Sequence, residues 1–156
     1  MIIILIISLL LECAISSIIS LNSIFNPLFL IISLVLLYPY LKKESTKYLI
    51  VCSVCGFIYD TIFYNSIFLN TISFFLLGLM IILLNKYLSK NILNAIIISI
   101  ISIIFYRLIS YSMVCMIGYT NFNILTLFKS IYTSLIINII YGIILYNVLK
   151  RIKNMI

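Results

Sequence analysis

The segment LLYPYLKKESTK, residues 36–47, decides the fold, because in it a long apolar stretch ends in a cluster of lysines. Two similar clusters follow, and they divide the chain into apolar stretches at 1–41, 48–85 and 91–149. About 40 residues reach roughly 60 Å as a helix, twice the ~30 Å hydrocarbon thickness of a bilayer. Each stretch therefore predicts two membrane-spanning helices. The clusters hold eight of the ten basic residues: Lys42, Lys43 and Lys47; Lys86 and Lys90; Lys150, Arg151 and Lys153.

The positions of these clusters also predict the sidedness of the chain. Lysine and arginine favour the cytoplasmic side of a membrane, so all three clusters are expected on that face. The sequence thus predicts an all-α, polytopic membrane protein with six transmembrane helices and both termini cytoplasmic. Residues 1–156 would form a single six-span transmembrane domain. We expect spans at about 2–21, 25–41, 48–64, 66–84, 92–115 and 130–149, with outer turns at 22–27 and 64–66 and a longer outer loop at 116–129.

The composition excludes a soluble globular domain. The chain is 65% hydrophobic and 8% charged, with a mean hydropathy of +1.35, far from the values of soluble proteins. The net charge of +7 could suggest nucleic acid, but the basic residues adjoin expected span ends. There they fix orientation and meet anionic lipid headgroups. We therefore expect membrane lipid, and no nucleic acid, as a partner.

Three ionisable residues fall inside the expected spans: Glu12, Asp60 and Arg107. A charge at mid-bilayer costs ~2.5–3.5 kcal/mol, so such residues face the bundle interior and find partners. Counted from the inner ends, Asp60 lies at ~18 Å and Arg107 at ~22 Å, close enough in depth to pair. Glu12, at ~15 Å, can join them or stay protonated. We favour a structural polar cluster over a proton relay or ligand site, because the chain has no histidine.

Small and polar residues follow three of the spans at helical spacing. Such stripes let helices approach closely and form interhelical hydrogen bonds. We interpret them as packing seams. They comprise Ser8, Glu12, Ser16 and Ser20; Cys52, Gly56 and Asp60; and Ser134, Asn138, Tyr141 and Gly142.

The C-x-x-C motif at Cys52 and Cys55 is typical of redox pairs or metal sites. A membrane thiol oxidoreductase would expose such a pair to the oxidising compartment, whereas here it lies near the expected cytoplasmic end. We interpret both cysteines as small packing residues, poor nucleophiles in apolar surroundings. With no nucleotide-binding or hydrolase motif present either, we expect no catalytic residue, cofactor or metal site.

The segment from Gly56-Phe-Ile-Tyr-Asp60 through Leu69-Asn70 to Gly78 resembles the characteristic region of the rod shape-determining protein MreD family. That family's pattern is Gly-x-x-x-Asp late in the third span, a tight turn, Leu-Asn or Leu-His, and an apolar helix with a glycine. Gly56 would let a neighbouring helix approach, so that the Asp60 carboxylate is shielded from lipid. Asn70 would lie at the same depth and bond Asp60. The interaction residues we single out are thus Glu12, Gly56, Asp60, Asn70 and Arg107.

The resemblance implies a non-enzymatic subunit of the bacterial cell-elongation machinery in the cytoplasmic membrane. Such a subunit binds MreC, a single-span protein with an extracytoplasmic domain. It acts beside the actin-like MreB and the peptidoglycan synthases. The family's fold is similar to the S components of energy-coupling-factor transporters, so a vitamin-binding subunit is the alternative. That alternative needs a ligand pocket, for which the short outer turns leave little material.

Overall fold

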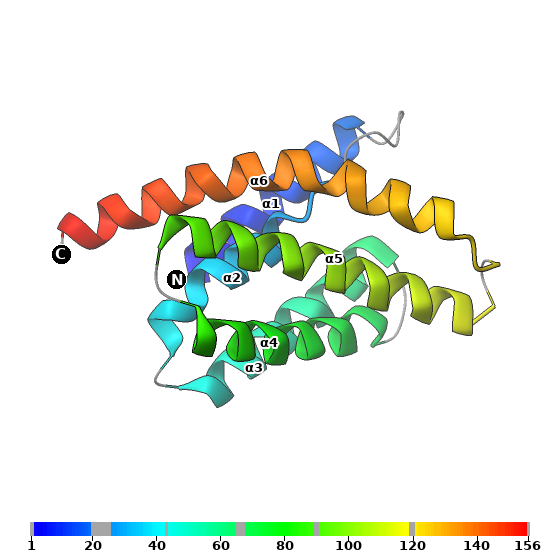
Figure 1. Ribbon diagram of the computed structural model, residues 1–156, viewed down its shortest axis with the longest axis horizontal. Coiled ribbons are helices and arrows are strands. Elements are labelled where there is room, and N and C mark those ends of the chain that lie inside the picture. Colours follow the sequence, from blue (N-terminus) through cyan, green and yellow to red (C-terminus); the bar gives the residue numbers. More distant parts are fainter. Residues whose placement is uncertain are drawn as a thin grey trace.

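In the computed structural model, residues 2–19, 26–42, 44–64, 68–88, 91–118 and 121–155 are described. Apart from short connections, these residues form helices, with no strand in these ranges (Figure 1). The turn residues 22–25 and 65–66, and Lys43 and Lys90, lie outside the described residues. The elements are α1 (Ile2–Ile19), α2 (Phe29–Leu41), α3 (Ser45–Tyr59), the π-helical η1 (Asp60–Tyr64), α4 (Leu69–Tyr87), α5 (Ile92–Met116) and α6 (Ile124–Met155).

The short helix α2 occupies the centre of the bundle. All side chains from Phe29 to Tyr38 are buried, and α2 contacts each of the other five α-helices. A helix that is apolar all round is buried on all sides, as this one is. Its 13 residues reach only ~20 Å, less than the ~30 Å of a bilayer's hydrocarbon. With Pro27 and Leu28 also buried, α2 begins inside the protein rather than at residue 25 as expected.

The remaining helices carry apolar side chains on their outer faces. α4, α5 and α6 are long and apolar enough to cross a membrane, whereas α1 and α2 are apolar but shorter. α3 and η1 follow each other directly from Ser45 to Tyr64. Exposed residues such as Ile50, Leu83 and Ile144 suit contact with lipid. These features fit a membrane protein, and the count of six spans stays a prediction.

The chain ends lie at the same end of the bundle (Figure 1). The C-terminal ends of α2, α4 and α6 and the start of α3 lie at that end too. Lys42, Lys86 and Lys150 are at or near those helix ends, and Lys47 is in the first turn of α3. This arrangement agrees with a single face for the basic clusters.

The expected loop at 116–129 is partly wrong. α6 begins at Ile124, so residues 124–129, including the exposed Lys129, are helical. The reason is local, because Asn123 caps the helix: the N–H of Leu125 donates to its Oδ1 at 2.9 Å. α6 also continues to Met155, past the expected end at 149.

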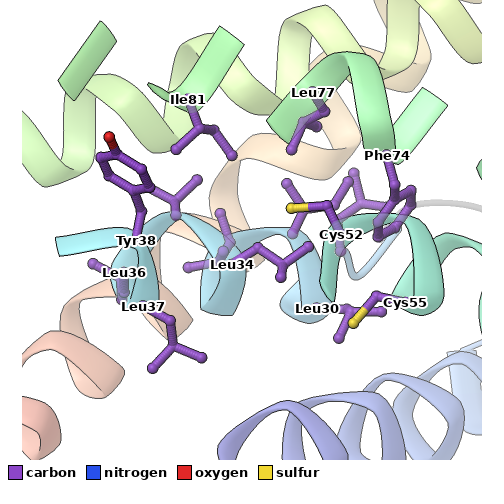
Figure 2. Close-up of a cluster of buried hydrophobic side chains, with 14 of the residues drawn as sticks. Leu30, Leu34, Leu36, Leu37, Tyr38, Cys52, Cys55, Phe74, Leu77 and Ile81 are labelled. Carbon is purple, nitrogen blue, oxygen red and sulfur yellow. The ribbon is translucent and has the colours of Figure 1, made fainter. Parts of the chain in front are cut away.

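Part of the hydrophobic core lies where α2, α3 and α4 meet (Figure 2). Phe74, Leu77 and Ile81 of α4 face Leu34 of α2 and Cys52 of α3. Cys52 is fully buried and Cys55 is 8% exposed; both are free thiols. Both cysteines therefore pack in the core, as the sequence suggested.

Candidate functional site

The carboxylate of Asp60 receives the beginning of helix α4. The backbone N–H and the Nδ2 of Asn70 donate to its Oδ1 at 2.8 and 3.0 Å. The backbone N–H and the hydroxyl of Thr71 donate to its Oδ2, both at 2.9 Å. The N-cap residue of α4, Phe68, makes no side-chain cap of its own and has a left-handed φ of 66°. Asp60 therefore supplies the cap that α4 lacks, from the point where α3 becomes π-helical.

Gly56 makes this contact possible. A Cβ atom at Gly56 would lie 2.6 Å from the carbonyl oxygen of Asn70 and 2.8 Å from the Cα of Thr71. Both are backbone atoms, so any larger residue would push α4 away from α3. In the structure Gly56 lies where α3 and α4 approach closely, and Asn70 is a hydrogen-bond partner of Asp60.

Glu12 performs the equivalent task at the buried beginning of α2. The N–H of Leu30 donates to its Oε2 at 3.0 Å. Asn138 of α6 completes the cap, because its Oδ1 accepts the N–H of Leu28 at 2.7 Å and its Nδ2 donates to the carbonyl of Asn26 at 3.1 Å. Non-helical backbone at membrane depth is tolerated only where protein satisfies its polar groups. Glu12 and Asn138 meet that requirement.

Two tyrosines extend these caps, and aromatic contacts join the two hydrogen-bonded clusters, which are together called the polar network here. The Tyr59 hydroxyl donates to Glu12 Oε1 at 2.7 Å, and the Tyr106 hydroxyl donates to Asn70 Oδ1 at 2.9 Å. The ring of Phe74 lies between theirs, with centroid distances of 5.5 and 5.6 Å. The network thus extends over α1 to α5, and α6 joins it through Asn138.

Sequence reasoning missed Tyr59 and Tyr106 as members of the network and assigned Asn138 only to a packing seam. Tyr59 and Tyr106 each directly precede a residue that was selected, Asp60 and Arg107. Their hydroxyls were the available signal, because a buried tyrosine O–H needs a partner.

Arg107 does not pair with Asp60, contrary to the sequence expectation. The ion pair found among the described residues joins the exposed Lys47 and Glu44. Arg107 is half-buried and donates from Nε to the hydroxyl of Ser134 on α6 at 2.9 Å. The similar depths expected for Arg107 and Asp60 therefore do not bring the two side chains into an ion pair.

The polar seam of α1 forms interhelical hydrogen bonds, as expected. The hydroxyls of Ser8 and Ser33 lie 2.6 Å apart, and the Ser33 hydroxyl also lies 3.3 Å from that of Tyr141 on α6. Ser33 donates in addition to the carbonyl of Phe29 on its own helix. Ser16 is half-buried, and Ser20 lies outside the described residues.

The two carboxylates of this network are buried and bonded within the chain. Glu12 and Asp60 are 1% and 2% exposed, and both oxygens of each carboxylate accept hydrogen bonds. Among the described residues, no group of three His, Cys, Asp or Glu side chains is placed to hold a metal ion. The carboxylates thus accept hydrogen bonds at the beginnings of α2 and α4.

Long apolar helices with lipid-facing surfaces, joined by a buried polar network, define the class of helical membrane proteins. Within that class the chain belongs to the MreD family: the model of the rod shape-determining protein MreD matches residues 1–155. The resemblance seen around Gly56 and Asp60 therefore holds over essentially the whole chain. No curated protein matches the chain, and no solved structure does. The family is one of structural, shape-determining membrane proteins.

Proposed function

We propose that this protein is a non-enzymatic subunit of the bacterial cell-elongation complex. It spans the cytoplasmic membrane six times with both termini inside and binds an MreC-type single-span protein. Contact with MreB and the peptidoglycan synthases is indirect, through that partner. The expected similarity of fold to energy-coupling-factor S components remains a prediction.

The family match is the observation that carries this proposal. The hydrogen bonding of the polar network supports it, because the two buried carboxylates are engaged in closing helix ends. A protein whose intramembrane polar groups serve its own packing is suited to hold partners rather than to transform them.

The outer end of α6 is the surface that best suits the partner. An exposed apolar patch, here called the α6 patch, lies at the end opposite the basic clusters, where an extracytoplasmic domain would approach. Leu127 is buried beside it and anchors the helix. The α6 patch consists of Phe122, Ile124, Leu125, Phe128 and Tyr132.

Co-purification with an MreC-type protein from the same organism tests the proposal. Leu125→Ser and Phe128→Ser together should lower partner recovery roughly tenfold or more, the effect of losing interface anchors. Ile62→Ser is the matched control, because Ile62 is an exposed apolar residue at the same end on η1. Recovery equal in all three proteins would overturn the assignment of the α6 patch. Failure of the wild type to retain the partner would overturn the function itself.

The vitamin-binding alternative receives no support from the cavity between α1 and α3. Its volume is about 250 Å³, and apolar side chains alone line it. Recognition of a polar vitamin needs precisely placed polar groups in the pocket. Equilibrium dialysis with water-soluble vitamins tests this point, and we expect no retention.

A further inference from the structure

A narrow apolar groove runs between α1 and α3. α1 packs against α2, and among the described residues its backbone makes no close approach to α3. Leu30 of α2 is part of the lining between the two helices, and both it and Cys55 point towards α1 in Figure 2. The groove is lined by Ile2, Leu5, Ile6, Leu9, Leu30, Ile50, Val51, Val54, Cys55 and Ile58.

The groove extends over a single leaflet. It begins at Ile2 and Ile50, near the end with the basic clusters, and reaches Leu9 and Ile58. One residue beyond Ile58, the Tyr59 hydroxyl bonds Glu12 and links α3 to α1. The eight residues from Ile2 to Leu9 extend ~12 Å, close to half of the ~30 Å hydrocarbon thickness. A transmembrane helix would continue into the other leaflet, where α1 and α3 are already bridged.

The size of the groove also favours a hydrocarbon chain over a protein helix. The empty space in the groove, about 680 Å³ with its open side included, is less than the roughly 900 Å³ that ~12 Å of a helix ~10 Å across occupies. A hydrocarbon chain is thinner than a helix and suits such a space. Its lining offers no polar group, which suits a chain without polar atoms.

A lysine stands at the mouth of the groove. Lys47 is spaced three, four, seven and eleven residues before Ile50, Val51, Val54 and Ile58, so it shares their face of α3. The Lys47 side chain is 68% exposed. Its Nζ lies 2.8 Å from Oε2 of Glu44, which stands three residues earlier at the beginning of α3. Such an exposed pair contributes little, so a phosphate group can compete for the ammonium.

We propose that this groove is a binding site for an anionic glycerophospholipid. One acyl chain lies between α1 and α3, and the phosphate of the headgroup meets Lys47. The site goes beyond the proposed function and does not depend on MreC binding. It would fix an annular lipid at the helix pair that the Glu12–Tyr59 hydrogen bond ties together.

Fluorescence quenching by brominated lipid tests the site. The chain contains no tryptophan, so Ile50→Trp places a single reporter at the groove. Leu83→Trp is the matched control on α4, since the two native residues are 61% and 59% exposed and lie at similar depths. Each full-length variant is reconstituted in vesicles of phosphatidylcholine containing either chain-brominated phosphatidylglycerol or chain-brominated phosphatidylcholine at equal mole fraction.

At position 50 we expect phosphatidylglycerol to bind with up to about fivefold preference, since one lysine near an anionic surface contributes ~1 kcal/mol. The preference should disappear with Lys47→Gln and increase with Glu44→Gln, which removes the competing carboxylate. Position 83 lies one turn from Lys86 on α4, so any preference measured there should stay the same with Lys47→Gln and Glu44→Gln. Circular dichroism verifies that each variant is folded.

Three results would overturn the proposal. Equal quenching by both lipids at position 50 would show that the groove does not prefer an anionic lipid. A preference for phosphatidylglycerol that persists with Lys47→Gln would show that Lys47 does not bind the headgroup. Protection of position 50 from both lipids, with position 83 quenched normally, would show that a protein segment covers the groove, either a partner helix or a second copy of the chain.

Discussion

At the scale of single residues, Asp60 and Glu12 perform the same task at two places in the bundle. Each carboxylate receives the N–H groups that begin the helix following its own, α4 for Asp60 and α2 for Glu12. A helix N-terminus carries a partial positive charge, which an anionic side chain complements. The charge that makes each residue costly in a membrane is thus offset by the end of a neighbouring helix.

Replacing Asp60 should destabilise the protein strongly. Asp60→Ala removes four hydrogen bonds and leaves the N–H groups of Asn70 and Thr71 without acceptors. We expect the free energy of unfolding to fall by about 2–4 kcal/mol. Asp60→Asn retains one acceptor oxygen and should lose about half as much. Unfolding of the detergent-solubilised protein measures both, with the exposed Glu44→Ala as control. Wild-type stability in Asp60→Ala would contradict the capping role.

Gly56→Ala should lower the free energy of unfolding, whereas Gly142→Ala should not. The new Cβ at position 56 would overlap backbone atoms of α4, whereas at position 142 its nearest contact is a methyl group of Ile32 at 3.3 Å. In a helix the exchange of glycine for alanine otherwise gains up to ~1 kcal/mol. The same unfolding measurement should therefore show a loss for position 56 and little change or a gain for position 142. Equal effects would mean that α3 and α4 separate easily.

At the scale of helices, α2 depends on neighbours for its first turn. Asn138 and Glu12 replace the water that would otherwise solvate the N–H groups near Leu28 and Leu30. Because α2 contacts all the other α-helices, loosening its first turn affects the centre of the bundle rather than its edge.

Asn138→Ala should therefore increase hydrogen exchange around the start of α2. We expect the amides of residues 28–32 to lose protection, because the acceptor for Leu28 and the donor to Asn26 are both removed. Ile144→Ala on the same helix, at an exposed position, is the control and should leave these amides unchanged. Exchange that rises equally in both variants would mean that α6, rather than the cap, was disturbed.

Part of this arrangement could be predicted from the sequence. Glu12, Asp60 and Asn70 stand out as polar residues in apolar helices, and Gly56 precedes Asp60 by one turn. Their roles as caps depend on where α2 and α4 begin, which hydropathy does not define. The pairing of Arg107 with Asp60 failed because depth gives only one coordinate. Arg107 is ~100° around α5 from Tyr106, and it is Tyr106 that faces α4.

At the scale of the whole molecule, the alternation of helix direction places the basic clusters together (Figure 1). The α6 patch and the first turn of α4 lie at the opposite end. The two ends therefore differ in charge: Lys42, Lys47, Lys86, Lys150 and Arg151 lie at one, whereas Lys129 lies at the other. This polarity agrees with the orientation expected from the positive-inside rule.

Cysteine accessibility in intact cells tests that orientation. In a cysteine-free background, a membrane-impermeant thiol reagent should label Phe122→Cys in intact cells. It should reach Glu44→Cys only after the cells are opened. Both positions are exposed in the bundle, so access depends on sidedness alone. Labelling of position 44 in intact cells would reverse the topology and remove the outer placement of the α6 patch.

α6 runs without interruption for 32 residues, ~48 Å, well beyond the ~30 Å core of a membrane. In the proposed orientation, a rod of that length would couple the two sides of the membrane mechanically. Any partner that tilts the tip bearing Leu125 must swing the far tip with Lys150 and Arg151 in the opposite direction. A movement of a partner outside the membrane would then be transmitted to the cytoplasmic end of α6.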